Sequence, residues 1–512
     1  MSTDSKTPTH KSVVIIGAGI SGIIQGAEIH RKKVLRDPQE ELVIFDKAGG
    51  FGGVWYANTY PGAACDIASH IYSISWFPKY DWSRRYSPQD EIRRYYEHVA
   101  HCYNLHKSTL FRHTVLSMHW DDAAVLWKVT VRNEETGTLH YYTAAAIISC
   151  IGQLNRPKRA NIPGAETFSG PQFHTAEWDH SVELTGKRVA VIGTGPSAGQ
   201  VIPSIADKVK SLHVYQRSPP HVLPRRDYAF SQPVKTLFAW VPLAQWLHHV
   251  WLYVDQELGA YRSVHVSSKE NGFAAAAAQA HLEAQIPPRC QALREKLTPQ
   301  YSFGCKRPLF LDDYYPAFLR DHVHLHTARL QRFTADAIAT ADGERHEIDV
   351  VIWATGFVTQ DLLGHVDVRG HQGVALKEQW GDHASAYLGT STHNFPNLFF
   401  VFGPATALLW GSLTFMFETQ ALWNVKMVQR IVAEARKGKR VGYAVKEERE
   451  RKYNAEMQEK LKVLALSDPR CDSFYKNSKG VVTTNFPWRL AEYWRRCLRI
   501  EWANYDKWET KL

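Results

Sequence analysis

Apolar and polar positions near the N-terminus follow the order strand, glycine turn, helix. The β-branched run 12–16 meets Gly17-Ala18-Gly19-Ile20-Ser21-Gly22 and continues as an apolar helical stretch through Ile29. A second apolar strand over 42–45 ends in Asp46. This order is typical of the βαβ unit that binds dinucleotides. The polar residues 1–11 before it are expected to be a disordered lead-in.

The same pattern returns in the middle of the chain. Residues 188–192 predict a strand, Gly193-Thr194-Gly195-Pro196-Ser197-Ala198 predicts the turn, and 212–215 predicts the next strand, which runs into Arg217 and Ser218. Further strands are predicted for 127–131, 146–149 and 348–354. The fold class predicted is therefore α/β, with two Rossmann-like dinucleotide-binding domains.

The strand pattern stops after Pro224, and residues 223–302 predict a helical insertion rich in Trp, Leu, His and Ala. Polar residues and a proline interrupt its most apolar window, 237–254, too often for a transmembrane helix. A buried or interface helix is expected there instead. The mixed-charge stretch 446–462 predicts a solvated helix.

Each of the three glycines of the first turn has a separate task in nucleotide binding. Gly17 permits the tight bend, Gly19 lets the backbone approach a pyrophosphate, and Gly22 lets the helix pack on the strand. Asp46 at the strand end would bind ribose hydroxyls.

In the second turn the strand end carries Arg217 and Ser218 instead of an acid. A guanidinium and a hydroxyl suit the 2′-phosphate of NADPH. The residues predicted to bind this cofactor are Gly193, Thr194, Gly195, Ser197, Ala198, Gln200, Arg217 and Ser218.

Composition excludes several classes of protein. The net charge of +10 comes from 61 basic against 51 acidic residues without a long basic run, so nucleic-acid binding is not expected. The seven cysteines form no C-x-x-C pair, so neither a disulfide framework nor a metal site is predicted, and a cytoplasmic location is the default. The sequence does not specify an oligomeric state.

Two nucleotide sites in one chain imply a flavin and a nicotinamide that exchange a hydride. Disulfide reductases share this plan, but they need a reactive cysteine pair, which this chain lacks. Molecular oxygen is the simplest remaining electron acceptor.

A motif just before the second turn is specific enough to indicate a family. Phe168, Gly170, His174 and Trp178 fill the four fixed positions of F-x-G-x-x-x-H-x-x-x-W, and Asp179 follows. The chain therefore resembles the Baeyer–Villiger monooxygenases, a family of class B flavin-dependent monooxygenases. Relatives that oxidise amines and sulfides usually have Tyr or Phe where Trp178 stands.

Three further segments are similar to the same family. Gly53-Val54-Trp55, with Asp66 and Tyr72, looks like the flavin-side wall. Gly304-Cys305-Lys306-Arg307-Pro308 looks like the segment with the family's active-site arginine, and 354–357 like the strand end that returns to the flavin domain.

The resemblance implies that FAD and NADPH are the cofactors and that O2 and a small-molecule ketone are the substrates. A C4a-peroxyflavin would attack the ketone and give an ester or lactone. Arg307 would stabilise the anionic peroxide, and Asp66 would orient the arginine. The alternatives are an enzyme that oxygenates nitrogen or sulfur or hydroxylates its substrate, and a redox-inactive nucleotide-binding regulator.

On this basis five segments are predicted. They are the first part of the FAD-binding domain at 1–150, the first part of the NADP-binding domain at 151–222, the helical insertion at 223–302, the second part of the NADP-binding domain at 303–357, and the completion of the FAD-binding domain with the C-terminal region at 358–512.

Overall fold

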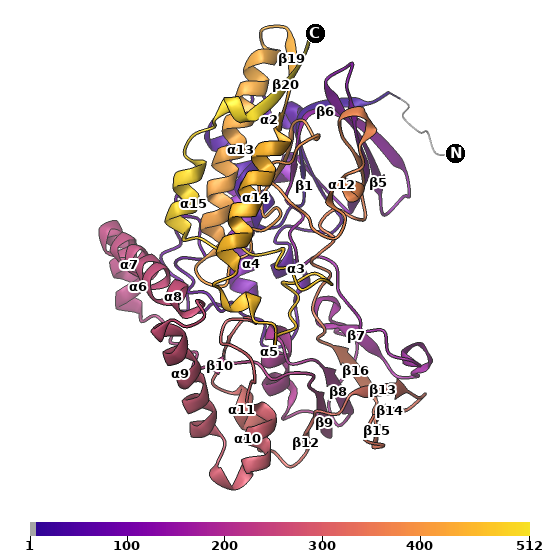
Figure 1. The fold of residues 1–512 in the computed structure, drawn as a ribbon, viewed down its shortest axis with the longest axis vertical. Coiled ribbons are helices and arrows are strands. Elements are labelled where there is room, and N and C mark those ends of the chain that lie inside the picture. The colour runs from indigo at the N-terminus through magenta and orange to yellow at the C-terminus, as the bar shows by residue number, and fades with distance from the viewer. Residues whose placement is uncertain (1–6, 512) are drawn as a thin grey trace.

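The chain forms two sheets with parallel strands at their centres, and one strand of each sheet leads into one of the predicted glycine turns. The computed structural model describes residues 7–511. One sheet lies in the upper half of the molecule and the other in the lower half (Figure 1). The predicted α/β fold with two Rossmann-like units is confirmed.

The upper sheet has the strand order β17-β4-β5-β6-β1-β2-β3, and β18 also pairs with β6. Its strands are β1 (Thr9–Ile16), β2 (Leu42–Asp46), β3 (Thr109–Phe111), β4 (His113–Asp121), β5 (Leu126–Asn133), β6 (Leu139–Ser149), β17 (Asp367–Arg369) and β18 (Leu398–Phe400). Strand β1 begins at Thr9 because residues 9–11 pair with 142–144 of β6. The expected lead-in is therefore wrong for residues 9–11, and residues 1–6 lie outside the described part of the chain.

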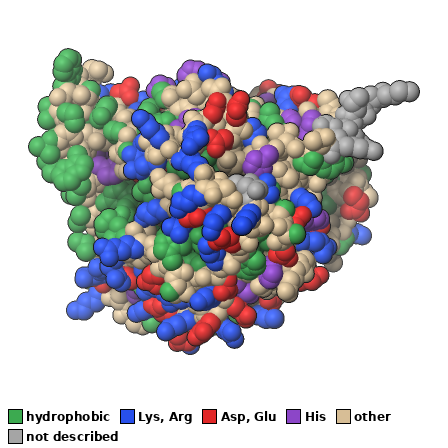
Figure 2. Space-filling view, turned by 90° about the horizontal axis from the view of Figure 1, so that it is seen from above, with side chains coloured by type: hydrophobic (Ala, Val, Ile, Leu, Met, Phe, Trp, Pro, Cys, Tyr) green, Lys and Arg blue, Asp and Glu red, His purple; other side chains and the backbone are tan. Residues whose placement is uncertain are grey.

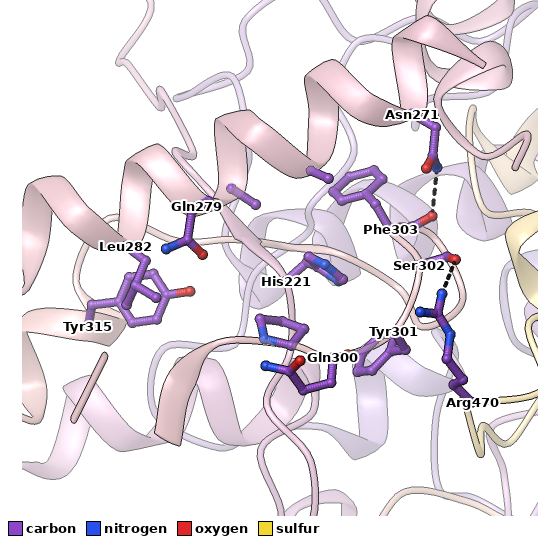
Figure 3. Close-up of a pocket in the computed structure, with 13 residues that line it drawn as sticks. His221, Asn271, Gln279, Leu282, Gln300, Tyr301, Ser302, Phe303, Tyr315 and Arg470 are labelled. Carbon is purple, nitrogen blue, oxygen red and sulfur yellow. Dashed lines mark hydrogen bonds between the residues drawn. The ribbon is translucent and has the colours of Figure 1, made fainter. Parts of the chain in front are cut away.

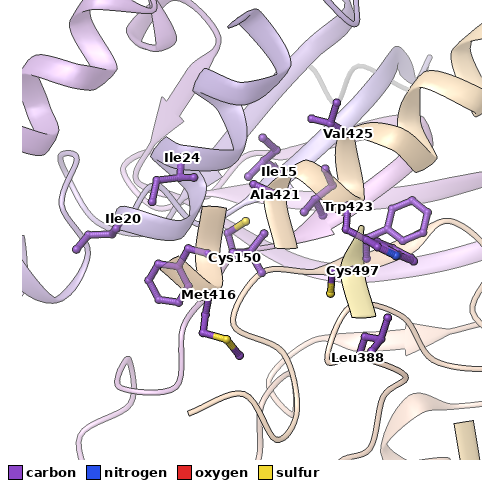
Figure 4. Packing of buried hydrophobic residues seen from close by; sticks show 14 of the residues in the cluster. Ile15, Ile20, Ile24, Cys150, Leu388, Met416, Ala421, Trp423, Val425 and Cys497 are labelled. Carbon is purple, nitrogen blue, oxygen red and sulfur yellow. The ribbon is translucent and has the colours of Figure 1, made fainter. Parts of the chain in front are cut away.

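Helices cover the upper sheet and form the largest core with it. Helix α1 (Ile20–Arg31) packs against α13 (Leu413–Ala435), and buried Ile24 and Met416 belong to the same apolar cluster as Cys150 behind the first glycine turn (Figure 4). The other elements of this half are α2 (Pro38–Glu41), α3 (Val54–Ala57), α4 (Gln89–Cys102), α12 (Leu376–Trp380), α14 (Glu447–Leu461), α15 (Leu490–Cys497), β19 (Lys439–Val445) and β20 (Tyr505–Lys511).

Helix α14 corresponds to the predicted mixed-charge helix, but one of its charges is not solvated. Glu450 is only 2% exposed and accepts hydrogen bonds from Ser385, Thr392 and the His393 backbone. The carboxylate thus holds the loop before β18 onto the helix.

The lower sheet is fully parallel in the order β12-β9-β8-β16-β7. Its strands are β7 (Gln172–His174), β8 (Arg188–Ile192), β9 (Ser211–Tyr215), β12 (Val323–His326) and β16 (Val350–Trp353). Helix α5 (Pro196–Ile205) follows the second glycine turn, and α11 (Tyr314–Ala317) precedes β12. A small antiparallel sheet, β13 (Leu330–Phe333), β14 (Ala337–Thr340) and β15 (Arg345–Glu347), connects β12 to β16.

Between the two halves of the lower sheet the chain forms helices, as the sequence predicts. They are α6 (Gln232–Trp240), α7 (Pro242–Asp255), α8 (Tyr261–Ser263), α9 (Lys269–Gln285) and α10 (Gln291–Leu297), flanked by the short strands β10 (Val222–Leu223) and β11 (Leu309–Phe310).

The window 237–254 is neither a single helix nor buried. Pro242 starts a new helix, and α6 and α7 form a hairpin that projects from the body (Figure 1). Trp240 is 82% exposed, and Leu243 and Trp246 are also exposed. Figure 2 shows hydrophobic side chains gathered on the projecting edge of the molecule. The prediction of a buried helix is wrong for this window, because most of its apolar side chains are uncovered, and the alternative of an interface helix stays a prediction. In the part of the chain that the structure describes, no helix is both long and apolar enough to cross a membrane.

The chain passes between the two sheets twice, and the two passages are hydrogen-bonded to each other. The Lys158 N–H donates to the Gly356 carbonyl, and the Val358 N–H donates to the Arg156 carbonyl, both at 2.9 Å. Residues Pro157 and Phe357 form an antiparallel bridge between these bonds. A short two-stranded ribbon therefore joins the two halves of the molecule.

Candidate active site

The first glycine turn leaves the N-terminus of α1 open to a ligand. Gly17 has φ +105°, and a Cβ there would lie 2.4 Å from the Cys150 carbonyl oxygen. The N-cap, Gly19, offers no side-chain cap to the first N–H groups of the helix. A Cβ on Gly19 would lie 3.3 Å from the Cα of Gly53, and one on Gly22 would lie 1.9 Å from the Gly17 oxygen. Free N–H groups and close backbone approach are what a pyrophosphate needs.

Asp46 lies at the end of β2 beside this turn. Its two oxygens accept hydrogen bonds from the backbone N–H groups of Ala18, at 2.6 Å, and Ala48, at 2.7 Å. Burial raises the pKa of Asp46, although both hydrogen bonds favour the charged form. The structure therefore shows Asp46 holding the glycine turn, and its contact with a ribose stays a prediction.

The second turn offers a similar arrangement at α5. The N-cap Gly195 has no side-chain cap on the helix, and a Cβ there would meet no atom within 4 Å. The turn itself is tight, because a Cβ on Gly193 would lie 2.5 Å from the Ala354 oxygen. Ala198 is fully buried against the sheet. Thr194 donates to the Ser218 carbonyl at 3.2 Å, which holds the turn beside the end of β9.

Gln200 on α5 reaches the loop that follows the flavin-side motif. Its amide oxygen accepts from the Tyr60 hydroxyl at 3.0 Å, and its amide nitrogen donates to the Ala64 carbonyl at 3.0 Å. Ser197 also contacts the Tyr60 hydroxyl. These two residues, predicted to bind the nicotinamide cofactor, thus contribute contacts between the two halves.

Positive charge collects where β9 ends. Arg217 is exposed and forms an ion pair with Asp472 at 3.1 Å. Lys306 donates a hydrogen bond to the Ser218 hydroxyl. Burial, with a further contribution from Arg217, lowers the pKa of Lys306. Sequence reasoning missed this contact of Lys306, although its position next to Arg307 was a signal that could have found it.

Arg307 and Asp66 form the strongest ion pair near the two turns. The guanidinium donates two hydrogen bonds of 2.7 Å to the two carboxylate oxygens, with the two residues 241 positions apart in sequence. Burial alone would raise the pKa of Asp66, but the charge and hydrogen bonds of Arg307 lower it below its ordinary value. Asp66 likewise outweighs the effect of burial on Arg307 and raises the pKa of the guanidinium. Both groups therefore remain charged.

The residues around this ion pair are mostly apolar or neutral. The Trp55 indole N–H donates to the Tyr72 hydroxyl at 3.1 Å, and α3, which contains Trp55, begins at Val54 directly after its N-cap Gly53. Burial raises the pKa of the Cys65 thiol to about 12 and that of the Tyr475 hydroxyl to about 12. The cation of Arg307 therefore sits among neutral groups with little competing charge.

The fingerprint residues pack at the place where the chain crosses between the sheets. The His174 side chain is fully buried, and its ring lies 5.5 Å from that of Phe357. In the sheet, His174 of β7 is the register partner of Trp353 of β16. The Trp178 ring lies 5.0 Å from the Phe173 ring, and Phe168 packs on Phe333. A Cβ on Gly170 would lie 2.3 Å from the Asp349 oxygen. The contacts of the motif are thus with the protein core.

A disulfide joins Cys305 to Cys471, against the prediction from sequence. The two cysteines are 166 positions apart, so no local spacing reveals them. They meet because the segment after α14 returns to the loop before β11, where Asp468 accepts from the Ser302 N–H at 2.9 Å. The disulfide lies two residues before Arg307 and four before Tyr475, and it ties these two segments together.

A cavity of about 390 Å³ lies between α9 and residues 299–303 of the loop before β11 (Figure 3). His221, Tyr301 and Arg470 are among its lining residues, and Arg470 donates to the Ser302 hydroxyl. Neither Arg307 nor Asp66 lines this cavity.

Comparison with known proteins gives matches along the whole chain. The sequence profile described as flavin-binding monooxygenase-like matches residues 10–240. An FAD-binding monooxygenase of Botryotinia fuckeliana is 38% identical over 495 residues, which cover 94% of this chain and 92% of the relative. A Baeyer-Villiger monooxygenase of Streptomyces coelicolor is 35% identical over 507 residues, which cover 99% and 94%. The crystal structure of cyclohexanone monooxygenase from Rhodococcus sp. Phi1 bound to NADP+ superposes with a TM-score of 0.85 at 26% identity, over 98% of this chain and 99% of that one.

Proposed function

Because the chain belongs to the Baeyer–Villiger monooxygenases, we propose that it inserts one atom of O2 beside the carbonyl of a ketone and forms an ester or lactone. It is a flavin-dependent enzyme that uses FAD and NADPH. We assign the oxygen-transfer step to Arg307 because its guanidinium forms two hydrogen bonds with the Asp66 carboxylate beside the flavin-side motif.

The two uncapped helix N-termini fit the two cofactors. The N–H groups of α1, with Gly19 and Gly53 in close approach, would hold the pyrophosphate of FAD, and those of α5 would hold that of NADPH. FAD, when bound and reduced, supplies the electrons and the centre at which O2 is activated.

Arg307 supports the oxygen-transfer step as a permanent cation. When an anionic oxygen nucleophile adds to the ketone carbon, its negative charge passes to the carbonyl oxygen, and a preorganised guanidinium would stabilise this charge before and after the addition. The carboxylate of Asp66 fixes the plane of this guanidinium through two hydrogen bonds and leaves its remaining N–H groups for the substrate side. Asp66 is in this view a positioning residue.

The neutral groups around Arg307 strengthen its effect. Tyr72, which Trp55 holds by a hydrogen bond, and Tyr475 cover part of Arg307 and leave its side chain 28% exposed. A charge acts more strongly where the surroundings are less polarisable.

Arg217, Ser218 and Lys306 account for the preference for NADPH. Two cations and a hydroxyl at the end of β9 form a site for the 2′-phosphate. Asp472, now paired with Arg217, would be displaced by the phosphate.

The test is product analysis with purified holoenzyme, NADPH and O2 over a panel of cyclic, open-chain and aryl ketones with sulfides of matched shape. We expect esters or lactones one oxygen atom heavier than the ketone, in proportion to the NADPH consumed. Formation of sulfoxides only, with every ketone unchanged, would overturn the proposal in favour of a heteroatom oxygenase.

A further inference from the structure

A group of histidines lies on the face of the lower sheet that points away from its main core. Strands β9 and β12 pair in parallel, with His213 opposite His324 and Tyr215 opposite His326. Their neighbours along the strands, such as Leu212 and Leu325, are buried in the apolar core on the other face. Because side chains alternate along a strand, the histidines share one face.

The small sheet β13–β15 brings a third histidine over this face. The ring centroid of His346, on β15, lies 3.9 Å from that of His326. The Nδ1 atom of His213 lies 3.1 Å from Nε2 of His326. One ring nitrogen from each of His213, His326 and His346 lies within 4.8 Å of the other two.

Neighbouring hydroxyls fix the orientation of the two outer rings. Ser211 contacts Nε2 of His213 at 3.2 Å, and the Tyr215 hydroxyl contacts Nδ1 of His346 at 3.1 Å. These contacts leave Nδ1 of His213 and Nε2 of His346 to face the centre of the group. Hydrogen bonds to the outer nitrogen are how proteins orient histidines that bind metal ions.

A carboxylate lies at the edge of the group, outside the three residues whose donor atoms share one centre. Glu344 Oε2 lies 3.1 Å from Nε2 of His346 and 4.0 Å from Nδ1 of His326. The Glu344 side chain is 62% exposed, so an ion can enter from solvent.

We propose that His213, His326 and His346 bind one transition-metal dication of the Zn²⁺ class, and that the exposed side chain of Glu344, which lies 3.1 Å from His346, turns in as the fourth ligand. Three imidazoles and a carboxylate are a donor set that suits Zn²⁺ in tetrahedral geometry, whereas Mg²⁺ and Ca²⁺ prefer oxygen ligands throughout.

The ion would join three separate pieces of the chain. It would fasten β15 to the edge strand β12 and to β9. His213, the ligand on β9, lies four residues before Arg217. Its role is structural, since neither Arg307 nor Asp66 belongs to the group.

The test uses the full-length holoenzyme without an affinity tag, dialysed against a chelator and titrated with ZnCl2 by calorimetry. We expect one Zn²⁺ per chain and a Zn²⁺-dependent rise in apparent Tm, with no response to MgCl2. His346→Ala should weaken Zn²⁺ binding by more than roughly 100-fold, because even loss of an outer-shell partner costs 10- to 100-fold. Glu344→Ala, at an exposed position, should weaken it by at least about tenfold in a folded protein.

His180→Ala is the matched control, because His180 is an exposed histidine of the same half of the molecule outside the group. It should leave Zn²⁺ affinity unchanged. The proposal is overturned if the wild type binds no Zn²⁺, or if His346→Ala and Glu344→Ala bind it as tightly as the wild type does.

Discussion

Replacing Arg307 by alanine separates the two halves of the proposed reaction. Hydride transfer from NADPH needs the two cofactors side by side, whereas oxygen transfer needs the cation that Arg307 provides beside Asp66. We therefore expect Arg307→Ala to be folded, yellow and able to oxidise NADPH, while most of the O2 consumed appears as H2O2.

The magnitude follows from what the substitution removes. Loss of one preorganised electrostatic donor costs about 10² to 10³ in rate. The substitution also leaves the Asp66 carboxylate without its partner, which for a fully buried pair costs about 3 to 5 kcal/mol of stability. Because Asp66 is 25% exposed and Arg307 28% exposed, we expect a smaller loss, roughly 1 to 3 kcal/mol.

Two further variants distinguish catalysis from stability. Arg307→Ala combined with Asp66→Ala should recover part of the lost stability and none of the ester formation. Arg225→Ala is the matched control, because Arg225 is a second arginine near Asp66 that donates to the Cys65 carbonyl at 3.3 Å without an ion pair to Asp66. It should change product yield by less than about tenfold.

The assay follows NADPH loss, O2 uptake, H2O2 and ester in the same reaction, with stopped-flow absorbance for flavin reduction. A wild-type ratio of ester to NADPH in Arg307→Ala would refute the reasoning. An equal loss of ester yield in Arg225→Ala would show that ester formation depends on positive charge near Asp66 in general and not on Arg307 itself.

Four other changes test separate parts of the structure. Arg217→Ala should raise the KM for NADPH by about 10- to 100-fold with little change for NADH, since a charge-assisted phosphate contact contributes about 1.5 to 3 kcal/mol, and equal changes for both cofactors would contradict it. Gly19→Val should yield protein with little bound FAD by absorbance, whereas Gly272→Val, where a Cβ meets no atom within 4 Å, should bind it normally. Burial raises the pKa of Glu418 from 4.5 to about 7, so its contribution to stability is full below pH 4.5 and lost as the pH rises through 7. Glu418→Gln should therefore remove up to about 3 kcal/mol of the pH dependence of the free energy of unfolding over this window, and parallel curves for variant and wild type would refute the assignment. Cys471→Ser should lower the apparent Tm, because loss of the disulfide costs about 2 to 4 kcal/mol of unfolding free energy. Dithiothreitol should lower the Tm of the wild type to that of the variant. Identical wild-type Tm values with and without reductant would show that the disulfide does not contribute to stability.

The parts of the fold that the sequence predicts are those encoded by neighbouring residues. Strand 188–192, its glycine turn and the helix after it lie within some twenty residues, and the structure has β8 at the predicted positions. Strand β1 was predicted too short because Thr9 to Lys11 are polar, and only their pairing with β6 extends it.

Features that depend on distant residues could not be predicted in this way. Lys306 meets Ser218 across 88 positions, and Cys305 meets Cys471 across 166. The residues of the histidine group come from three strands, so no spacing marks them as a set. Arg307 was identified through its resemblance to a family motif, whereas its contact with Asp66 required the three-dimensional arrangement.

The ribbon between the two halves has a mechanical consequence. The two passages of the chain bond to each other at Pro157 and Phe357, so the halves share one narrow joint and not two separate tethers. A two-stranded ribbon bends across its flat face more readily than it stretches or shears, because bending leaves the Lys158 to Gly356 and Arg156 to Val358 hydrogen bonds intact. Any change in the distance between the two nucleotide turns would therefore occur as rotation about this joint. The bonds of Gln200, the Arg307–Asp66 ion pair and the Cys305–Cys471 disulfide, which connect the halves away from the joint, would limit the extent of this rotation.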